Sequence, residues 1–164
     1  MKKITILLII LLSTQLYSQN KNLTPFVGTW IWQDGNETFT VELYVEDNSI
    51  KGHYKLEENN NGVLTTIYNS NRLLNQEHNF YYGYAIYGFS KNGDLLYGHV
   101  DDNVLYGPGY DTKIGNLAFT IVNDGFDGQP MTATWVIRPN IGMKSTNEPD
   151  NFNIPTNITL TKTN

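Results

Sequence analysis

The segment Glu37–Glu46, ETFTVELYVE, alternates apolar and polar side chains along its whole length. A period of two places Phe39, Val41, Leu43 and Val45 on one face of an extended strand, with the polar residues and Tyr44 on the other. Such a strand packs one face on a core and turns the other to water, which is typical of an antiparallel sheet. Asp47-Asn48 then turns the chain into a second alternating run over residues 49–57, so the two segments predict a hairpin.

Similar runs recur after residue 20, separated by Asn, Gly and Asp, and none shows convincing helical periodicity. The segment 80–89, FYYGYAIYGF, is dense in aromatic residues on both faces and is expected to be covered on both sides. A polar loop is expected at 71–79 and a long crossover at 139–155. The pattern predicts an all-β protein: a single antiparallel barrel, or a half-open barrel, of about 8–9 strands. The expected strands are 26–33, 37–46, 49–57, 63–70, 80–89, 94–101, 116–122, 131–138 and 157–163.

The composition of the 164-residue chain excludes several classes of protein. The absence of cysteine excludes a disulfide scaffold, a thiolate metal site and a cysteine nucleophile. A net charge of −5 argues against nucleic-acid binding, which needs a basic face. With 13% aromatic and only 16% charged residues, and no linker, the chain suits one sheet-rich domain.

The first residues have the order of a secretory signal peptide: basic Met1–Lys3, apolar Ile4–Leu12 and small polar Ser13–Gln19. We expect a leader at 1–18 and one β-barrel-like domain at 19–164; an amphipathic or buried helix of the fold is the alternative. The apolar run is about half the ~20 residues that span a bilayer. The mature protein is therefore expected to be periplasmic or extracellular, without a stable membrane anchor, and monomeric.

The Gly28-Thr29-Trp30 motif at the head of the first strand resembles the opening motif of the calycin superfamily, which includes the lipocalins and fatty-acid-binding proteins. The resemblance implies that Trp30 closes one end of a barrel and that Arg138 or Lys162 covers it, a contact with a cation–π component.

The whole chain is also similar to a family of small secreted Bacteroidota proteins, of flavobacterial type, classed only as a domain of unknown function. The similarity is carried by Tyr17-Ser18-Gln19, by Gly28-Thr29-Trp30 followed by Glu37-Thr38-Phe39-Thr40, and by the string from Ile154 to Lys162. It implies an exported protein and no particular activity.

Three histidines could carry chemistry: His53, His78 and His99. His53 and His78 are expected at the surface. His99 shares a strand face with Asp101, next to Asp102, which would suit a base with an orienting carboxylate or an ordinary polar pair at a strand end. Because no serine has the context of a nucleophile elbow, the sequence predicts no catalytic residue.

The Asn123–Gly128 segment, NDGFDG, has a faint likeness to a calcium loop, but it lacks the EF-hand spacing and the final glutamate. A turn built from residues that tolerate positive φ explains it better. We therefore predict no metal ligands and no cofactor.

The surplus of aromatic residues leads to two hypotheses for function. If the inward-facing aromatics line a cavity, the protein binds a small, partly polar ligand; if they pack as a solid core, it does not. In the second case, an envelope or extracellular protein-interaction module would show an exposed patch around Tyr81, Tyr87 and Phe89. The predicted ligand-binding residues are Trp32, Tyr54, Tyr82, Tyr84, Tyr97 and Trp135.

Overall fold

The computed structural model describes residues 22–71, 73–75, 80–81, 83–90, 93–105, 112–142 and 145–163. In these residues it contains strands and one short 3-10 helix, η1 (Thr24–Phe26), so the predicted all-β class is confirmed. The predicted leader lies outside the described residues. The strands are β1 (Gly28–Asp34), β2 (Glu37–Glu46), β3 (Ser49–Asn60), β4 (Val63–Asn69), β5 (Leu73–Asn75), β6 (Phe80–Tyr81), β7 (Ile86–Ser90), β8 (Leu95–Asp102), β9 (Lys113–Asn123), β10 (Thr132–Pro139) and β11 (Asn157–Lys162).

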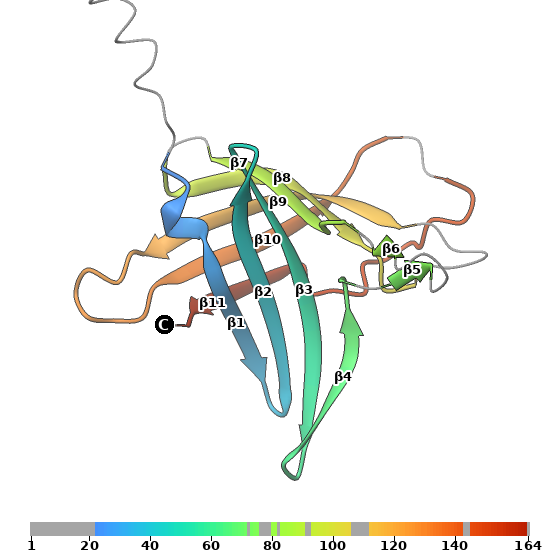
Figure 1. Ribbon diagram of the computed structural model, residues 1–164, viewed down its shortest axis with the longest axis horizontal. Helices are drawn as coiled ribbons and strands as arrows, with labels where there is room; N and C mark the ends of the chain where they lie inside the picture. The colour runs from blue at the N-terminus through green and yellow to red at the C-terminus, as the bar shows by residue number, and fades with distance from the viewer. Residues whose placement is uncertain are drawn as a thin grey trace, which may run out of the picture.

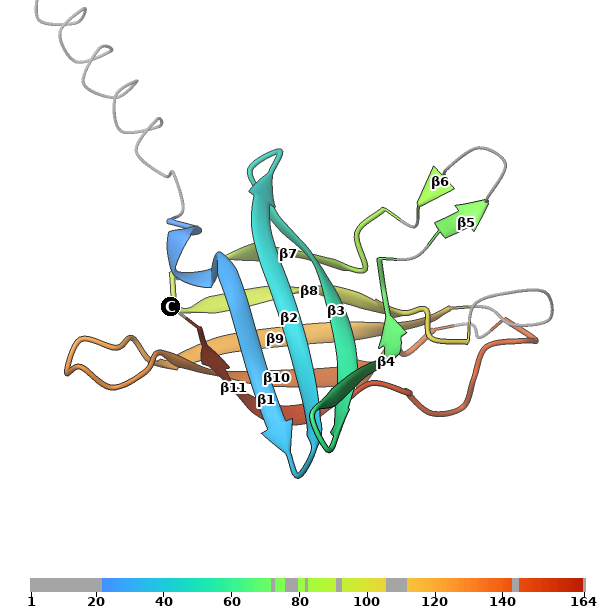
Figure 2. The same ribbon diagram turned by 60° about the horizontal axis from the view of Figure 1, so that its bottom comes forward.

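Eight of these strands close an antiparallel barrel. Its order is β1-β2-β3-β7-β8-β9-β10-β11, and β11 pairs back onto β1 through Trp30 opposite Lys162 and Ile31 opposite Thr161. Each barrel strand thus pairs with the next barrel strand along the chain, and the first and last strands meet. Figure 2 shows β1, β2 and β3 crossing steeply over the layer formed by β7 to β11.

Strand β3 changes partner on one of its edges. Its first residues pair with β7, where Lys51 lies opposite Tyr87, and its later residues, from Lys55 onward, pair with β4. Strand β4 is therefore an addition to the barrel, and the β3–β4 turn projects beyond the neighbouring strands in Figure 1. Strands β5 and β6 form a separate two-stranded sheet beside it.

Aromatic rings form a continuous series of contacts in the described part of the barrel interior. The Trp30 and Phe119 ring centroids lie 4.9 Å apart, and Phe119 also contacts Trp135 at 6.5 Å. Phe39 continues the series, 6.0 Å from Trp135 and 5.9 Å from Tyr54. All five side chains are at most 2% exposed, so their apolar area contributes strongly to stability.

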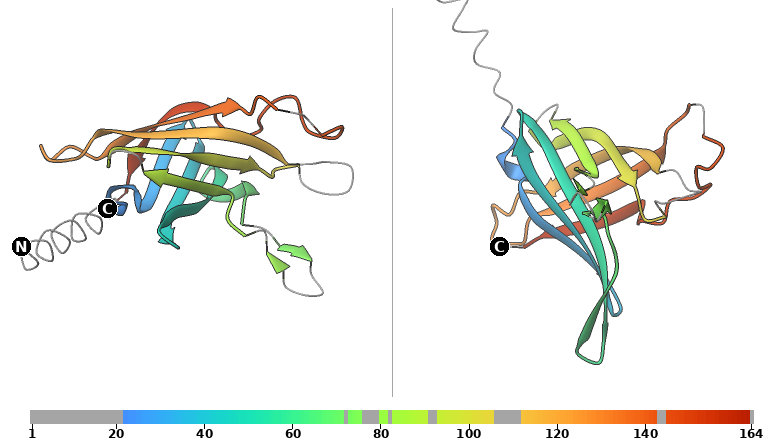
Figure 3. Two further views of the ribbon diagram at one scale, coloured as in Figure 1. Left: turned by 90° about the horizontal axis from the view of Figure 1, so that it is seen from above. Right: turned by 45° about the vertical axis from the view of Figure 1, so that its right-hand side comes forward.

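The crossover between β10 and β11 is held against one end of the barrel. The buried Lys113 ammonium on β9 donates to the Glu148 carboxylate at 3.1 Å and to the Pro149 carbonyl at 2.9 Å. The buried Asp102 carboxylate at the end of β8 accepts hydrogen bonds from the backbone and side-chain N–H groups of Asn153. Seen from above, in the left panel of Figure 3, the crossover (red) extends from the barrel beside the end of β9.

The segment 80–89 differs from its prediction. It forms two strands, β6 and β7, rather than one, and it is not covered on both sides, because Tyr84 is 38% and Phe89 is 50% exposed. Only one face of β7 packs on the core; the aromatic residues on its other face remain at the surface. Within the described residues, no helix has the length and apolar character needed to cross a membrane.

A glycine permits the close approach of β7 and β8. A Cβ on Gly98 would collide with the Tyr87 carbonyl and would lie 2.6 Å from the Gly88 Cα. Because backbone cannot yield as a flexible side chain does, we predict that Gly98→Ala lowers the free energy of unfolding by about 1–3 kcal/mol, measured by urea denaturation. Gly83→Ala is the matched control, since its Cβ would meet no atom within 4 Å. Equal stability of the two variants would contradict the packing described.

The Lys113 contacts are expected to hold the crossover against the barrel. Lys113→Met keeps the aliphatic stem but removes the ammonium that holds Glu148 and Pro149. We expect faster amide hydrogen exchange across residues 145–156, with β9 and β10 still protected. The 123–129 loop of the same variant serves as the internal reference, and unchanged exchange at 145–156 would show that other contacts hold the crossover.

Candidate functional site

The Trp30 indole closes the barrel end that lies beside η1. It is fully buried, and its Nε1–H donates to the Phe26 carbonyl at 2.8 Å. The Lys162 ammonium lies 5.3 Å from the indole and donates to the Pro25 carbonyl at 3.0 Å. Gly28 has a φ of 125°, and a Cβ there would lie 3.1 Å from the Lys162 Cε. The absence of a side chain at Gly28 therefore permits the positive φ and leaves room for the Lys162 side chain.

Of the two cations considered for this contact, the structure places Lys162 over the indole. Arg138 is exposed, opposite Asn116 at the far end of β10, so its assignment as the covering cation is wrong. Partial burial lowers the pKa of Lys162.

The predicted ligand-binding residues do not form one internal site. Trp135 and Tyr54 belong to the packed core, and Trp32 is half-buried beside it. Tyr84 and Tyr97 lie on the outer surface, at 38% and 48% exposure, so the prediction that they face inward is wrong. On β8 the inward positions are instead Leu96 and Val100, and Tyr97 has the opposite parity. Tyr82 lies outside the described residues, as does His78.

The Tyr54 hydroxyl has a structural role. It donates toward the Asp101 carbonyl at 2.9 Å and accepts from the Asn103 N–H at 3.1 Å. The Asn103 side chain donates to the Ser70 carbonyl at 2.9 Å. Burial raises the pKa of Tyr54, so the phenol stays protonated and able to donate. This network satisfies buried polar groups where β3 changes from β7 to β4.

His99 lies on the outer face of β8, whereas the Asp102 carboxylate is buried. Its ring contacts Tyr87 on the outer face, with centroids 5.4 Å apart. The Asp102 carboxylate is buried and occupied by Asn153 and by the Val104 N–H. Hydrogen bonding at a strand end, the simpler interpretation, therefore accounts for Asp102.

Exposed aromatic residues gather on the outer face of β7 and β8. We call Tyr84, Tyr87, Phe89, Tyr97 and His99 the outer aromatic cluster. The Tyr87 ring is central, stacked on Tyr84 at 5.5 Å and edge-on to Phe89 at 4.9 Å. Across the sheet, Phe89 lies opposite Tyr97 and Tyr87 lies opposite His99.

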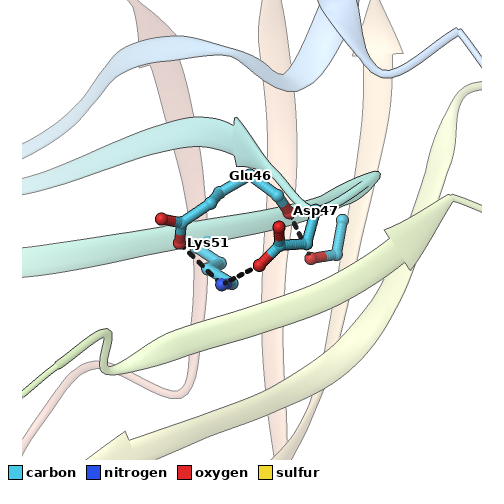
Figure 4. A network of polar contacts seen from close by, with 4 residues as sticks. Glu46, Asp47 and Lys51 are labelled. Carbon is cyan, nitrogen blue, oxygen red and sulfur yellow. Dashed lines mark hydrogen bonds and ion pairs between the residues drawn. The ribbon is translucent and has the colours of Figure 1, made fainter.

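A charged group borders this cluster. The Lys51 ammonium lies 4.8 Å from the centre of the Tyr84 ring. It forms ion pairs with the carboxylates of Glu46 at 2.6 Å and Asp47 at 3.2 Å. Figure 4 shows these two ion pairs. The bond to Glu46 is the largest cause of a raised pKa for Lys51. Its charge is therefore fixed and locally neutralised, leaving the tyrosines as the exposed feature.

A polar pocket of about 170 Å³ opens on the outer face of β2, β3 and β4. It lies where β3, after its pairing with β7, begins to pair with β4. Glu42 lies opposite His53, and Lys55 lies between Thr40 and Asn69 in the register. The residues lining it are Thr40, Glu42, His53, Tyr54, Lys55, Asn69 and Asn71.

His53 is oriented by the buried Ser70. The Ser70 Oγ accepts the Tyr54 N–H at 2.8 Å and lies 3.5 Å from the His53 Nδ1. The Ser70 hydroxyl can donate to Nδ1 or accept from it, depending on the tautomer of the ring. Burial lowers the pKa of His53, and the nearby Glu42 partly offsets this effect. His53 is thus a neutral donor at neutral pH, although it was expected to be an ordinary surface residue.

The 123–128 segment folds as a turn. Asn123 and Asp124 each accept a backbone N–H two residues ahead, at 2.8 Å and 3.0 Å. Within the part of the chain that the structure describes, no group of three or more histidine, aspartate or glutamate side chains is placed to hold a metal ion.

Comparisons with known proteins place the chain in a family but indicate no activity. Residues 1–93 match the family described as "Family of unknown function (DUF6705)". No curated protein matches the chain. No solved structure matches it either.

The Trp30–Lys162 contact predicts a measurable loss of stability. Lys162→Met removes both the cation over the indole and the bond to the Pro25 carbonyl. We expect a loss of about 1–3 kcal/mol in the free energy of unfolding, followed by tryptophan fluorescence in urea. Lys55→Met, which removes a lysine paired with Glu57 nearer the surface, should cost less than about 1 kcal/mol. Equal effects would argue against a special role for Lys162.

Proposed function

Because the chain belongs to a family of unknown function, we propose from its geometry that this β-barrel is an exported, non-catalytic binding protein. Its binding surface is the outer aromatic cluster, and its partner is a protein of the cell envelope or the extracellular space. The observation that carries the proposal is the mutual packing of these exposed rings around Tyr87.

The chemistry of the cluster suits a protein interface. Tyr and Phe side chains supply large contact areas at a small cost in conformational entropy, and tyrosine is prominent among residues that dominate interface energies. Phe89 is 50% and Tyr97 is 48% exposed, so each has apolar area still to bury. Tyr87 is half-buried at the centre and holds its neighbours in place.

The packed interior weakens the hypothesis of a ligand inside the barrel. Within the described interior, the Phe39 ring contacts both Trp135 and Tyr54, so these three side chains pack against one another instead of lining a site together. A small, partly polar ligand remains a second candidate function, favoured by the pocket between β2, β3 and β4 on the outer face.

Export is supported by the leader at 1–18, whose basic, apolar and polar regions follow one another in the order of a signal peptide. Removing it leaves 9 basic and 16 acidic residues, a net charge near −7. We expect the mature N-terminus, determined by mass spectrometry of the exported protein, to lie within a residue or two of Gln19.

The surface is tested by Tyr87→Ser combined with Phe89→Ser in cells that export the protein. We expect the unaltered protein to sediment with the envelope fraction. The amount of the double variant in the soluble fraction should be at least tenfold higher, because two rings of the proposed interface are lost. The circular dichroism spectrum of each variant is first compared with that of the unaltered protein to confirm native folding.

Ile114→Ser with Val122→Ser is the matched control, because both residues are exposed apolar side chains on β9, outside the cluster. This control should keep the distribution of the unaltered protein. Release of both double variants alike, or of neither, would contradict a role for the outer aromatic cluster.

A further inference from the structure

We propose that the pocket between β2, β3 and β4 binds a single neutral pyranose ring, either as a free sugar or as the end of a glycan. This binding function is distinct from the protein interface proposed above. It follows from the mixture of hydrogen-bonding groups in the pocket, their near-neutral charge, the adjacent aromatic rings and the small volume.

The pocket presents donors and acceptors close together on adjacent strands. Glu42 offers two carboxylate oxygens, and the register places the His53 ring, which has one N–H donor and one acceptor nitrogen when neutral, directly opposite on β3. Asn69 uses its amide oxygen to accept the Asn71 N–H at 2.9 Å, which leaves its NH₂ group to donate. Neighbouring hydroxyls of a sugar, each both donor and acceptor, match such an alternation of groups.

The charges in the pocket select against ionic ligands. Glu42 would repel an anion, and Lys55 would repel a cation. The Lys55 ammonium is already paired with the Glu57 carboxylate at 2.8 Å, and His53 is neutral. A neutral polyhydroxylated ligand carries no charge for either group to repel, and it can use the Glu42 carboxylate as a strong hydrogen-bond partner.

One exposed aromatic ring, that of Tyr44, contacts His53, which lines the pocket. The Tyr44 and His53 rings lie 6.3 Å apart with 33° between their planes, and Tyr44 is 37% exposed. The C–H groups on one face of a pyranose are apolar and weakly positive, so they suit the negative face of an aromatic ring. A simple polyol without a ring would not present such a face.

The pocket volume limits the ligand to one ring. About 170 Å³ is below the roughly 300 Å³ at which drug-sized sites begin. The pocket opens on the outer surface, so further sugars of a glycan could extend into solvent. A ligand of this size should bind weakly, with a Kd on the order of 1 mM.

Saturation-transfer NMR on the mature protein tests the proposal with methyl glycosides of glucose, mannose and galactose, and with N-acetylglucosamine. We expect transfer to the ring protons of at least one of these and little to glycerol. Glucuronate and glucosamine form the charged arms, and stronger binding of either would contradict a neutral ligand. No transfer to any pyranoside at 10 mM would overturn the proposal.

Substitutions locate the site. Glu42→Ala and Asn69→Ala, both at exposed positions, should each weaken binding of the best pyranoside at least tenfold. Asn116→Ala, an exposed amide on β9, is the matched control and should leave the Kd unchanged. Equal binding by all three variants would place any sugar site elsewhere. Because Tyr87→Ser with Phe89→Ser leaves the pocket lining intact, failure of the envelope test and failure of sugar binding are distinguishable.

Discussion

The divided edge of β3 is the constraint on which the surrounding structure depends. A strand edge offers one row of backbone groups, and here β7 takes the first part and β4 the later part. At the point of change the buried groups must find other partners, and the Tyr54–Ser70–Asn103 network supplies them. The polar pocket lies beside this point of change, since Lys55 and Asn69 both line it and are paired there.

The described aromatic residues fall into a buried group and an exposed group. Inside, Trp30, Phe119 and Trp135 pack edge to face and leave their area fully buried. Outside, Tyr87 and its neighbours form a second group whose rings stay accessible. The cross-strand pairs of Phe89 with Tyr97 and of Tyr87 with His99 stabilise the sheet and at the same time present exposed rings to a partner.

The local sequence pattern was sufficient to predict many of the strands, because alternating apolar and polar residues indicate a strand with one buried and one exposed face. Residues 37–46 were predicted as a strand with the bounds that β2 has. The pattern failed where aromatics occupy both faces: in 80–89 and at Tyr97 it could not separate a core ring from a surface ring. The pocket could not be predicted, since Glu42 and Asn69 meet only through the register of three strands. The Gly-x-Trp motif pointed to Trp30, but only the pairing with β11 chooses Lys162 over Arg138.

The pairing of β1 with β11 sets the timing of folding. The hydrogen bond from the Thr163 N–H to the Thr29 carbonyl joins residues 134 positions apart, and β1 has no second neighbour until β11 arrives. Contacts of such long sequence separation form late, because the intervening chain must first be brought together. In a nascent chain the barrel would hence stay open until β11 emerges.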